Sequence, residues 1–200
     1  NDIKAETDEN LLRERHQAGN PGNDMILVTK KSYSDFRPVC LDFDILGAAQ
    51  PFLNYDNIKL IKFCPEEYSF GTPRAMCDIH GGTGMDVLNG KAKVLTEHGE
   101  DWTEGMIQAS ERMLSLAIKE NIEIAILMDI SAACGSQVIY NGNRFIEHPS
   151  YLIGAGVCAA QLMLNGFKVI SQRDFASLEI VYSKIDRKHS VDQSKLDHHE

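Results

Sequence analysis

The residues best suited to chemistry in this chain are its five cysteines, which lie at wide and irregular spacings among 200 residues. An odd number of cysteines without a regular pattern is a poor basis for a disulfide framework, so we predict free thiols in a reducing, cytoplasmic setting. Thiolates are the ligands that soft metals and iron–sulfur clusters prefer. The first question is therefore which cysteines lie where a ligand would bind: Cys40, Cys64, Cys77, Cys134 or Cys158.

Two of these cysteines follow predicted strands directly. The β-branched run at 58–63 ends at Cys64, and the apolar run at 122–128 is followed by a short turn that carries Cys134. Because ligands in open α/β sheets bind beyond the carboxyl ends of strands, we expect both thiols at one rim of the sheet. Cys40 is a candidate third ligand from another segment. Three thiolates would leave a fourth coordination position open, as a catalytic metal requires.

The other candidates have both a structural and a functional interpretation. Buried cysteine often acts as a small hydrophobe, and this is the prediction for Cys158 in an apolar helix and for Cys77 in a strand-like segment. Glu66 and Glu67 directly follow Cys64-Pro65, and either one of them is a proton carrier in the site or both are surface glutamates. Ser131 precedes Cys134 by three positions and is either a site residue or a turn serine.

The alternation of strand-like and helix-like segments predicts an α/β fold built from βαβ units. Six apolar positions between Trp102 and Ala117 recur at helical spacing, and Asn141-Gly142 is a strong hairpin turn signal. We expect a Rossmann-like three-layer sandwich with a mostly parallel sheet. Its predicted strands span 25–30, 58–63, 91–96, 122–128 and 167–171, and its predicted helices 102–120, 150–166 and 173–185.

Composition divides the chain into three parts and restricts its partners. Residues 1–23 are predicted to be a polar extension, 24–185 the α/β domain and 186–200 a solvated tail. No apolar run is long enough to predict a membrane span. With a net charge of −9, the chain has few cations to spare for phosphates, so a small-molecule partner is favoured over nucleic acid. No oligomeric state follows from the sequence.

Several segments, taken together, resemble the DUF523 family, whose characterised members are thiouracil desulfurases. The resemblance covers roughly residues 37 to 171, in the same order and spacing as in the family. Its most specific features are a Cys-Pro-Glu followed by Gly-x-Pro-Arg and a Ser-x-x-Cys-Gly. The segments that carry it are FCPEEYSFGTPR (63–74), GGTGMDVLNGKAKV (81–94), GEDWTEGMIQASERMLSLA (99–117), IAILMDISAACGSQVIYNG (124–142), GAGVCAAQL (154–162) and GFKVIS (166–171).

The resemblance implies an enzyme with a [4Fe-4S] cluster held by three cysteines, which here would be Cys40, Cys64 and Cys134. It also implies catalytic roles for Glu66, which matches the glutamate of Cys-Pro-Glu, and for Ser131, which matches the first serine of the family's Ser-Pro-Ser-Cys-Gly motif. The implied reaction is a non-redox desulfuration of a thiolated pyrimidine such as 2-thiouracil, with release of hydrosulfide.

Other interpretations stay open at this point. The segment around Cys40 departs from the family's first motif, and Ser-Ala-Ala-Cys replaces Ser-Pro-Ser-Cys. A divergent member without a cluster would be a small-molecule or protein binder, and zinc on the cysteines would give a hydrolase. Within the favoured interpretation, the substrate is a free thiobase or a thiolated tRNA, and the negative net charge favours the free base.

Overall fold

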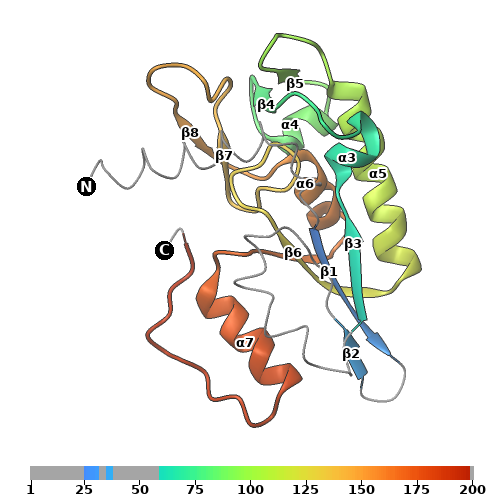
Figure 1. The fold of residues 1–200 in the computed structure, drawn as a ribbon, viewed down its shortest axis with the longest axis vertical. Helices are drawn as coiled ribbons and strands as arrows, with labels where there is room; N and C mark the ends of the chain where they lie inside the picture. The colour runs from blue at the N-terminus through green and yellow to red at the C-terminus, as the bar shows by residue number, and fades with distance from the viewer. Residues whose placement is uncertain (1–24, 32–34, 38–58, 199–200) are drawn as a thin grey trace.

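The computed structural model describes residues 25–31, 35–37 and 59–198 (Figure 1). The predicted 1–23 extension and Cys40 lie outside the described residues. The described part is a mixed α/β structure. No helix of this part is long and apolar enough to cross a membrane.

The main sheet has five strands, of which β2, β1, β6 and β9 lie side by side in this order, and β3 also pairs with β1. β1 pairs antiparallel with β2, β3 and β6, whereas β6 pairs parallel with β9. The predicted parallel pairing is thus confirmed for β6 and β9, and the rest of the described sheet is antiparallel. Hydrophobic periodicity identifies a strand but not the direction in which it pairs, which explains the difference. The strands are β1 (Met25–Lys31), β2 (Asp35–Arg37), β3 (Lys59–Phe63), β6 (Ile122–Leu127) and β9 (Lys168–Ser171).

The parallel pair is the one place where a βαβ crossover is described. Helix α6 (Val157–Leu164) lies between β6 and β9 in the chain and packs against β9 and α5. A parallel connection needs such a crossover to return the chain to the same edge of the sheet. The Rossmann-like three-layer arrangement stays a prediction.

Two small antiparallel sheets accompany the main one. In the first, β4 (Cys77–His80) pairs with β5 (Lys93–Thr96), which agrees with the strand predicted at 91–96. In the second, β7 (Val138–Tyr140) pairs with β8 (Tyr151–Ile153). Figure 1 shows both at the end of the molecule opposite β2.

The second small sheet corrects two predictions. The chain bends at Asn141-Gly142, with Gly142 at φ 79°, but the predicted tight hairpin is not formed, because β7 does not pair with the residues immediately after it. The chain runs on to residue 150 before β8 forms. The predicted helix at 150–166 is therefore wrong in its first turns, and α6 begins only at Val157. The apolar sequence around two glycines, Gly154 and Gly156, is compatible with both a buried helix and a short strand.

Helix α5 (Thr103–Lys119) confirms the predicted apolar stripe. Its buried side chains include Met106, Ala109, Met113 and Ala117, and the helix packs against α6 and α3. Burial of such side chains is the main source of stability in a domain of this size. The remaining short helices are α3 (Pro65–Phe70) and α4 (Gly84–Leu88).

Helix α7 (Phe175–Ile185) is followed by a C-terminal segment that folds back along it. Most side chains of 187–196 are exposed. The segment is nevertheless attached: Asp197 accepts hydrogen bonds from the backbone nitrogen and hydroxyl of Ser177, and His189 lies 2.8 Å from Glu179. These contacts tie the end of the chain to α7.

Candidate functional site

Three strands of the main sheet have their carboxyl ends at the same end of the sheet. β3 and β6 both run antiparallel to β1, and β9 runs parallel to β6, so β3, β6 and β9 share one direction. The pairing register places Phe63 opposite Met25, and Ile126 opposite the next residue, Ile26. Neighbouring strands lie about 4.8 Å apart, so the ends of β3 and β6 are separated by roughly 10 Å. The predicted common rim for Cys64 and Cys134 follows from this direction, although β1 lies between the two strands.

Cys64 connects the end of β3 to the start of α3. It is the N-cap residue of that helix, and its Sγ accepts a hydrogen bond from the backbone nitrogen of Glu67 at 3.3 Å. The side chain of Arg74 also donates to this sulfur, with a distance of 3.8 Å from Nη2. Burial, reinforced by the negative charge of Glu66, raises the pKa of the Cys64 thiol to about 12. The free thiol is thus protonated at neutral pH.

Cys134 lies in the loop that follows β6, and this loop is fastened to the start of α6. The backbone nitrogens of Val157 and Cys158 donate to the carbonyls of Ala132 and Ala133, both at 2.8 Å. These are among the first nitrogens of a helix, which have no partner inside the helix itself. Burial, and then the nearby Cys158, raises the pKa of the Cys134 thiol well above its ordinary value. The helix start therefore fixes the position of the Cys134 loop.

Gly156 permits this close approach of loop and helix. A Cβ atom on Gly156 would lie 2.6 Å from the carbonyl oxygens of both Ser131 and Ala132. We therefore expect Gly156→Ala to displace the Cys134 loop and to lower the free energy of unfolding by about 1–3 kcal/mol. Chemical denaturation measures this loss. In Gly99→Ala, where no atom lies within 4 Å of the new Cβ, only the cost of a positive φ is expected, and an equal effect in both variants would contradict the steric argument.

The loop contains a strained residue directly before Ser131. Ile130 has a φ of 55°, a conformation that β-branched residues rarely adopt. Such a conformation costs on the order of 1–3 kcal/mol and persists only where neighbouring contacts enforce it. On one side the backbone nitrogen of Asp129 donates to the Gln172 side chain at 2.7 Å, and on the other the Ser131 carbonyl accepts from Gly135 at 2.8 Å.

The predicted residues Glu66 and Ser131 lie together. Ser131 Oγ accepts hydrogen bonds from the backbone nitrogens of Ala133 and Cys134, and it donates its one hydrogen to Glu66 Oε1 at 3.4 Å. The second carboxylate oxygen, Oε2, accepts from Arg74 Nε at 3.2 Å. Both Glu66 and Arg74 are largely buried. One hydrogen-bonded network therefore joins the Cys64 sulfur, through Arg74 and Glu66, to the Ser131 loop.

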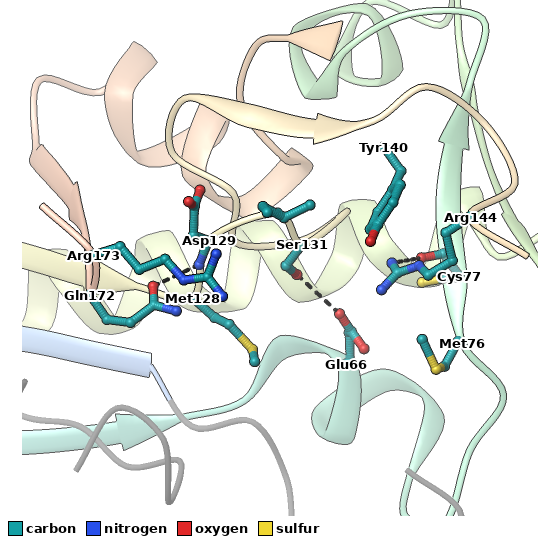
Figure 2. A pocket seen from close by; sticks show the side chains of 11 residues that line it. Glu66, Met76, Cys77, Met128, Asp129, Ser131, Tyr140, Arg144, Gln172 and Arg173 are labelled. Atoms are coloured by element: carbon teal, nitrogen blue, oxygen red, sulfur yellow. Dashed lines mark hydrogen bonds between the residues drawn. The ribbon is translucent and has the colours of Figure 1, made fainter. Parts of the chain in front are cut away.

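A cavity opens above the Glu66–Ser131 pair (Figure 2). Glu66 and Ser131 both line this cavity, whose empty volume of about 610 Å³ includes space open to solvent. In Figure 2 the pair lies at the centre, with Arg144 and Tyr140 toward one end and Asp129, Gln172 and Arg173 toward the other. The other lining residues are Met76, Cys77, Met128 and Ile130.

Sequence reasoning missed several of these residues. Arg74 was visible only as the last residue of the Gly-x-Pro-Arg motif, and no role was predicted for it. Cys77 is buried in a strand as predicted, but it also lines the cavity. Gln172 and Arg173 directly follow β9, the third strand whose carboxyl end lies at this end of the sheet, so the rule that singled out Cys64 and Cys134 would also have found them.

The donor set is consistent with part of a cluster site. Cys64 and Cys134 are buried thiols, the side-chain type that soft metals prefer, and the N–H donors on the Cys64 sulfur are of the kind that tune iron–sulfur clusters. Within the described residues, no group of three or more His, Cys, Asp or Glu side chains is arranged to hold a metal. The predicted third ligand, Cys40, lies outside these residues. Among the predicted residues, Ser131 contacts Glu66, Cys64 is connected to Glu66 through Arg74, and the Cys134 backbone nitrogen donates to Ser131 Oγ.

Ser131 is expected to matter more than an ordinary turn serine. Ser131→Ala removes the donor to Glu66 and the acceptor for two backbone nitrogens of the Cys134 loop. Loss of hydrogen bonds to buried groups costs about 1–3 kcal/mol. We therefore expect a lower unfolding midpoint, and a rate of the implied desulfuration that falls about tenfold or more. Ser136→Ala is the matched control, because it is a buried serine of the same loop outside the Glu66 contact. Equal effects on rate in both variants would contradict the assignment.

Comparison with known proteins bears directly on the family. The model of the 2-thiouracil desulfurase family matches residues 45–174, a range that includes Cys64, Glu66, Ser131 and Cys134 but begins after Cys40. The uncharacterized protein YbbK of Bacillus subtilis (strain 168) is 42% identical over 120 residues, which are 60% of this chain and 78% of YbbK.

Among solved structures, the chain is similar to the [4Fe-4S]-dependent thiouracil desulfidase TudS. The sequence identity is 31%, the TM-score is 0.49, and the match covers 70% of this chain and 80% of that one. The family model spans well over half of the present chain, and the segments that it matches include those on which the DUF523 resemblance was based. The chain belongs to the 2-thiouracil desulfurase family.

Proposed function

We propose that this protein is a desulfidase that removes sulfur from a thiolated pyrimidine base, such as 2-thiouracil, with the help of a [4Fe-4S] cluster. The observation that carries the proposal is the Glu66–Ser131 pair, which lines a cavity and is connected through Arg74 to the Cys64 sulfur. Membership of the family supports the same reaction.

In this proposal, Cys64, Cys134 and Cys40 would hold the cluster, which when bound would supply an iron with an affinity for the soft sulfur of a thiocarbonyl. Glu66 acts as the general base that takes a proton from the attacking water. Arg74 and Ser131 each bond one of its carboxylate oxygens and so fix the direction of the carboxylate. The water oxygen forms the new carbon–oxygen bond, the carbon–sulfur bond breaks, and sulfur leaves as hydrosulfide without net oxidation or reduction.

A free base is the substrate that we favour over a thiolated tRNA. The net charge of −9 disfavours binding of a polyanion. Cys64, Cys77 and Cys158 form no disulfide in the described part of the chain, which is consistent with the proposed reducing, cytoplasmic setting.

The test is the iron and acid-labile sulfide content per chain after anaerobic reconstitution, together with a visible spectrum and an assay for uracil and sulfide from 2-thiouracil. We expect about four iron and four sulfide per chain, and release of uracil and sulfide in equal amounts. A well-folded protein that takes up neither iron nor sulfide would exclude the cluster, and zinc in its place would point to a hydrolase. A reconstituted protein inert toward thiolated bases would overturn the proposed reaction.

A further inference from the structure

We propose that Arg144 selects the substrate by binding an oxygen on the pyrimidine ring, remote from the sulfur that is removed. This inference rests on the proposed function and extends it, because it names the group that recognises the base. Arg144 lies at one end of the cavity (Figure 2).

Arg144 is fixed by a buried ion pair with Asp78 of β4. Its Nε donates to Asp78 Oδ1 at 2.9 Å and its Nη2 to the same oxygen at 2.6 Å. Nη2 also donates to the carbonyl of Cys77 at 3.0 Å, and the backbone nitrogen of Arg144 donates to Asp78 Oδ2 at 3.0 Å. The guanidinium carbon lies 4.7 Å from the centre of the Tyr140 ring. Every part of this side chain except Nη1 is thus constrained.

The Nη1 group is the part of Arg144 that remains for a ligand. A guanidinium has five N–H donors, of which two are on Nη1, and in the described part of the chain no residue accepts a hydrogen bond from that nitrogen. Arg144 lines the cavity, and Figure 2 shows its guanidinium directed toward the interior from the β4 side. The Arg144 side chain is 17% exposed, and a ligand oxygen in the cavity can accept the hydrogen bond that Nη1 has left to donate.

The charge balance identifies the kind of oxygen. Because Asp78 already neutralises the guanidinium, Nη1 offers a strong, directed donor but no excess positive charge. This arrangement favours a neutral carbonyl over a phosphate, which would need an uncompensated cation. A thiopyrimidine that carries a second, oxygen-bearing ring carbon supplies such a carbonyl. We infer that the base binds with its thiocarbonyl toward Glu66 and its carbonyl toward Arg144.

The experiment compares two substrates and two variants of the reconstituted protein. The substrates are 2-thiouracil and pyrimidine-2-thione, which is the same ring without the oxygen at C4. In the wild type, we expect kcat/KM for pyrimidine-2-thione to be about 10- to 100-fold lower, as for loss of one hydrogen bond to a charged group. Arg144→Lys keeps a cation beside Asp78 but removes the planar fork that holds Nη1 in place. Arg144→Lys should lower kcat/KM for 2-thiouracil by the same factor, mainly through a higher KM. It should leave kcat/KM for pyrimidine-2-thione nearly unchanged.

Isothermal titration calorimetry measures the affinity for uracil, a readout that does not depend on turnover. This affinity should fall by the same 10- to 100-fold in Arg144→Lys. Arg112→Lys, the same change at an exposed position of α5, is the control and should alter neither quantity. If Arg144→Lys does not fold, the double variant Asp78→Asn/Arg144→Met removes the pair without leaving a buried charge, and the same loss of preference for 2-thiouracil is expected.

The outcomes separate this inference from the proposed function. Equal effects of Arg144→Lys on both substrates, or none, in an active protein would overturn the role of Arg144 and leave desulfuration standing. Loss of preference in Arg173→Lys alone would place the oxygen at the opposite end and also overturn it. If the protein has no turnover but Arg144→Lys still weakens uracil binding, the role of Arg144 is supported and the proposed reaction is refuted. A wild type that neither turns over nor binds uracil would overturn both.

Discussion

Replacement of Cys64 or Cys134 by alanine is expected to abolish both the cluster and the turnover of 2-thiouracil. Each substitution removes one of the three proposed ligands, and both sulfurs lie in rigid surroundings: Cys64 at the start of α3, and Cys134 in a loop bonded to the start of α6. We expect iron to fall from about four per chain to well below one, with loss of the visible absorption and of detectable uracil formation. Iron content, the spectrum and the assay are measured on the same anaerobic preparations.

Cys158→Ala is the control for this prediction. Cys158 is a free and fully buried thiol close to Cys134, but its segment is predicted to contribute to the core. It should keep the cluster and lose only the small stabilisation of a buried side chain, about 1 kcal/mol. A Cys64→Ala or Cys134→Ala protein that retains full iron and activity would refute the ligand assignment, as would loss of the cluster in Cys158→Ala alone.

Glu66→Gln is expected to lower kcat by about 10²- to 10⁴-fold, the usual contribution of a general base. Glutamine keeps the shape of the side chain and can still accept from Ser131 or Arg74, but it cannot take a proton from water. Iron content and the visible spectrum should remain those of the wild type, because Glu66 is not a proposed ligand. Steady-state kinetics on reconstituted protein with measured iron content gives kcat and KM separately.

Glu67→Gln provides a matched comparison at the neighbouring residue. The Glu67 side chain is exposed, and only its backbone nitrogen contacts the Cys64 sulfur, so we expect kcat within about twofold of the wild type. If Glu66→Gln retains wild-type kcat, the base lies elsewhere in the cavity. If Glu66→Gln loses its iron as well, its role is to hold the site together and not to move a proton.

The two sets of predictions probe different parts of one network. The cysteines would hold the group that binds sulfur, whereas Glu66 would act on the water that replaces it. Arg74 contacts both, since it donates to Cys64 through Nη2 and to Glu66 through Nε. Variants of Arg74 would therefore mix the two effects, which is why the tests are made on its two partners.

The amino-acid sequence by itself determined which residues are the candidates and at which end of each strand they lie. The apolar run before Cys134 and the β-branched run before Cys64 predicted strands that the structure contains, and the apolar stripe of α5 was predicted almost residue by residue. These are local properties, because side-chain periodicity depends only on neighbouring residues. The motifs that carry the family resemblance are equally local, and the comparison with the family confirmed them.

Only the tertiary structure decided how the strands pair and what surrounds the candidates. β1 pairs antiparallel between β3 and β6, and β7 pairs with β8 across a ten-residue loop, because pairing depends on segments distant in sequence. The same long-range folding brings Arg144 onto Asp78, 66 positions earlier, and Ser131 onto Glu66, 65 positions earlier. The chemistry of single residues can be read along the chain, but a cavity exists only where the fold makes distant residues neighbours.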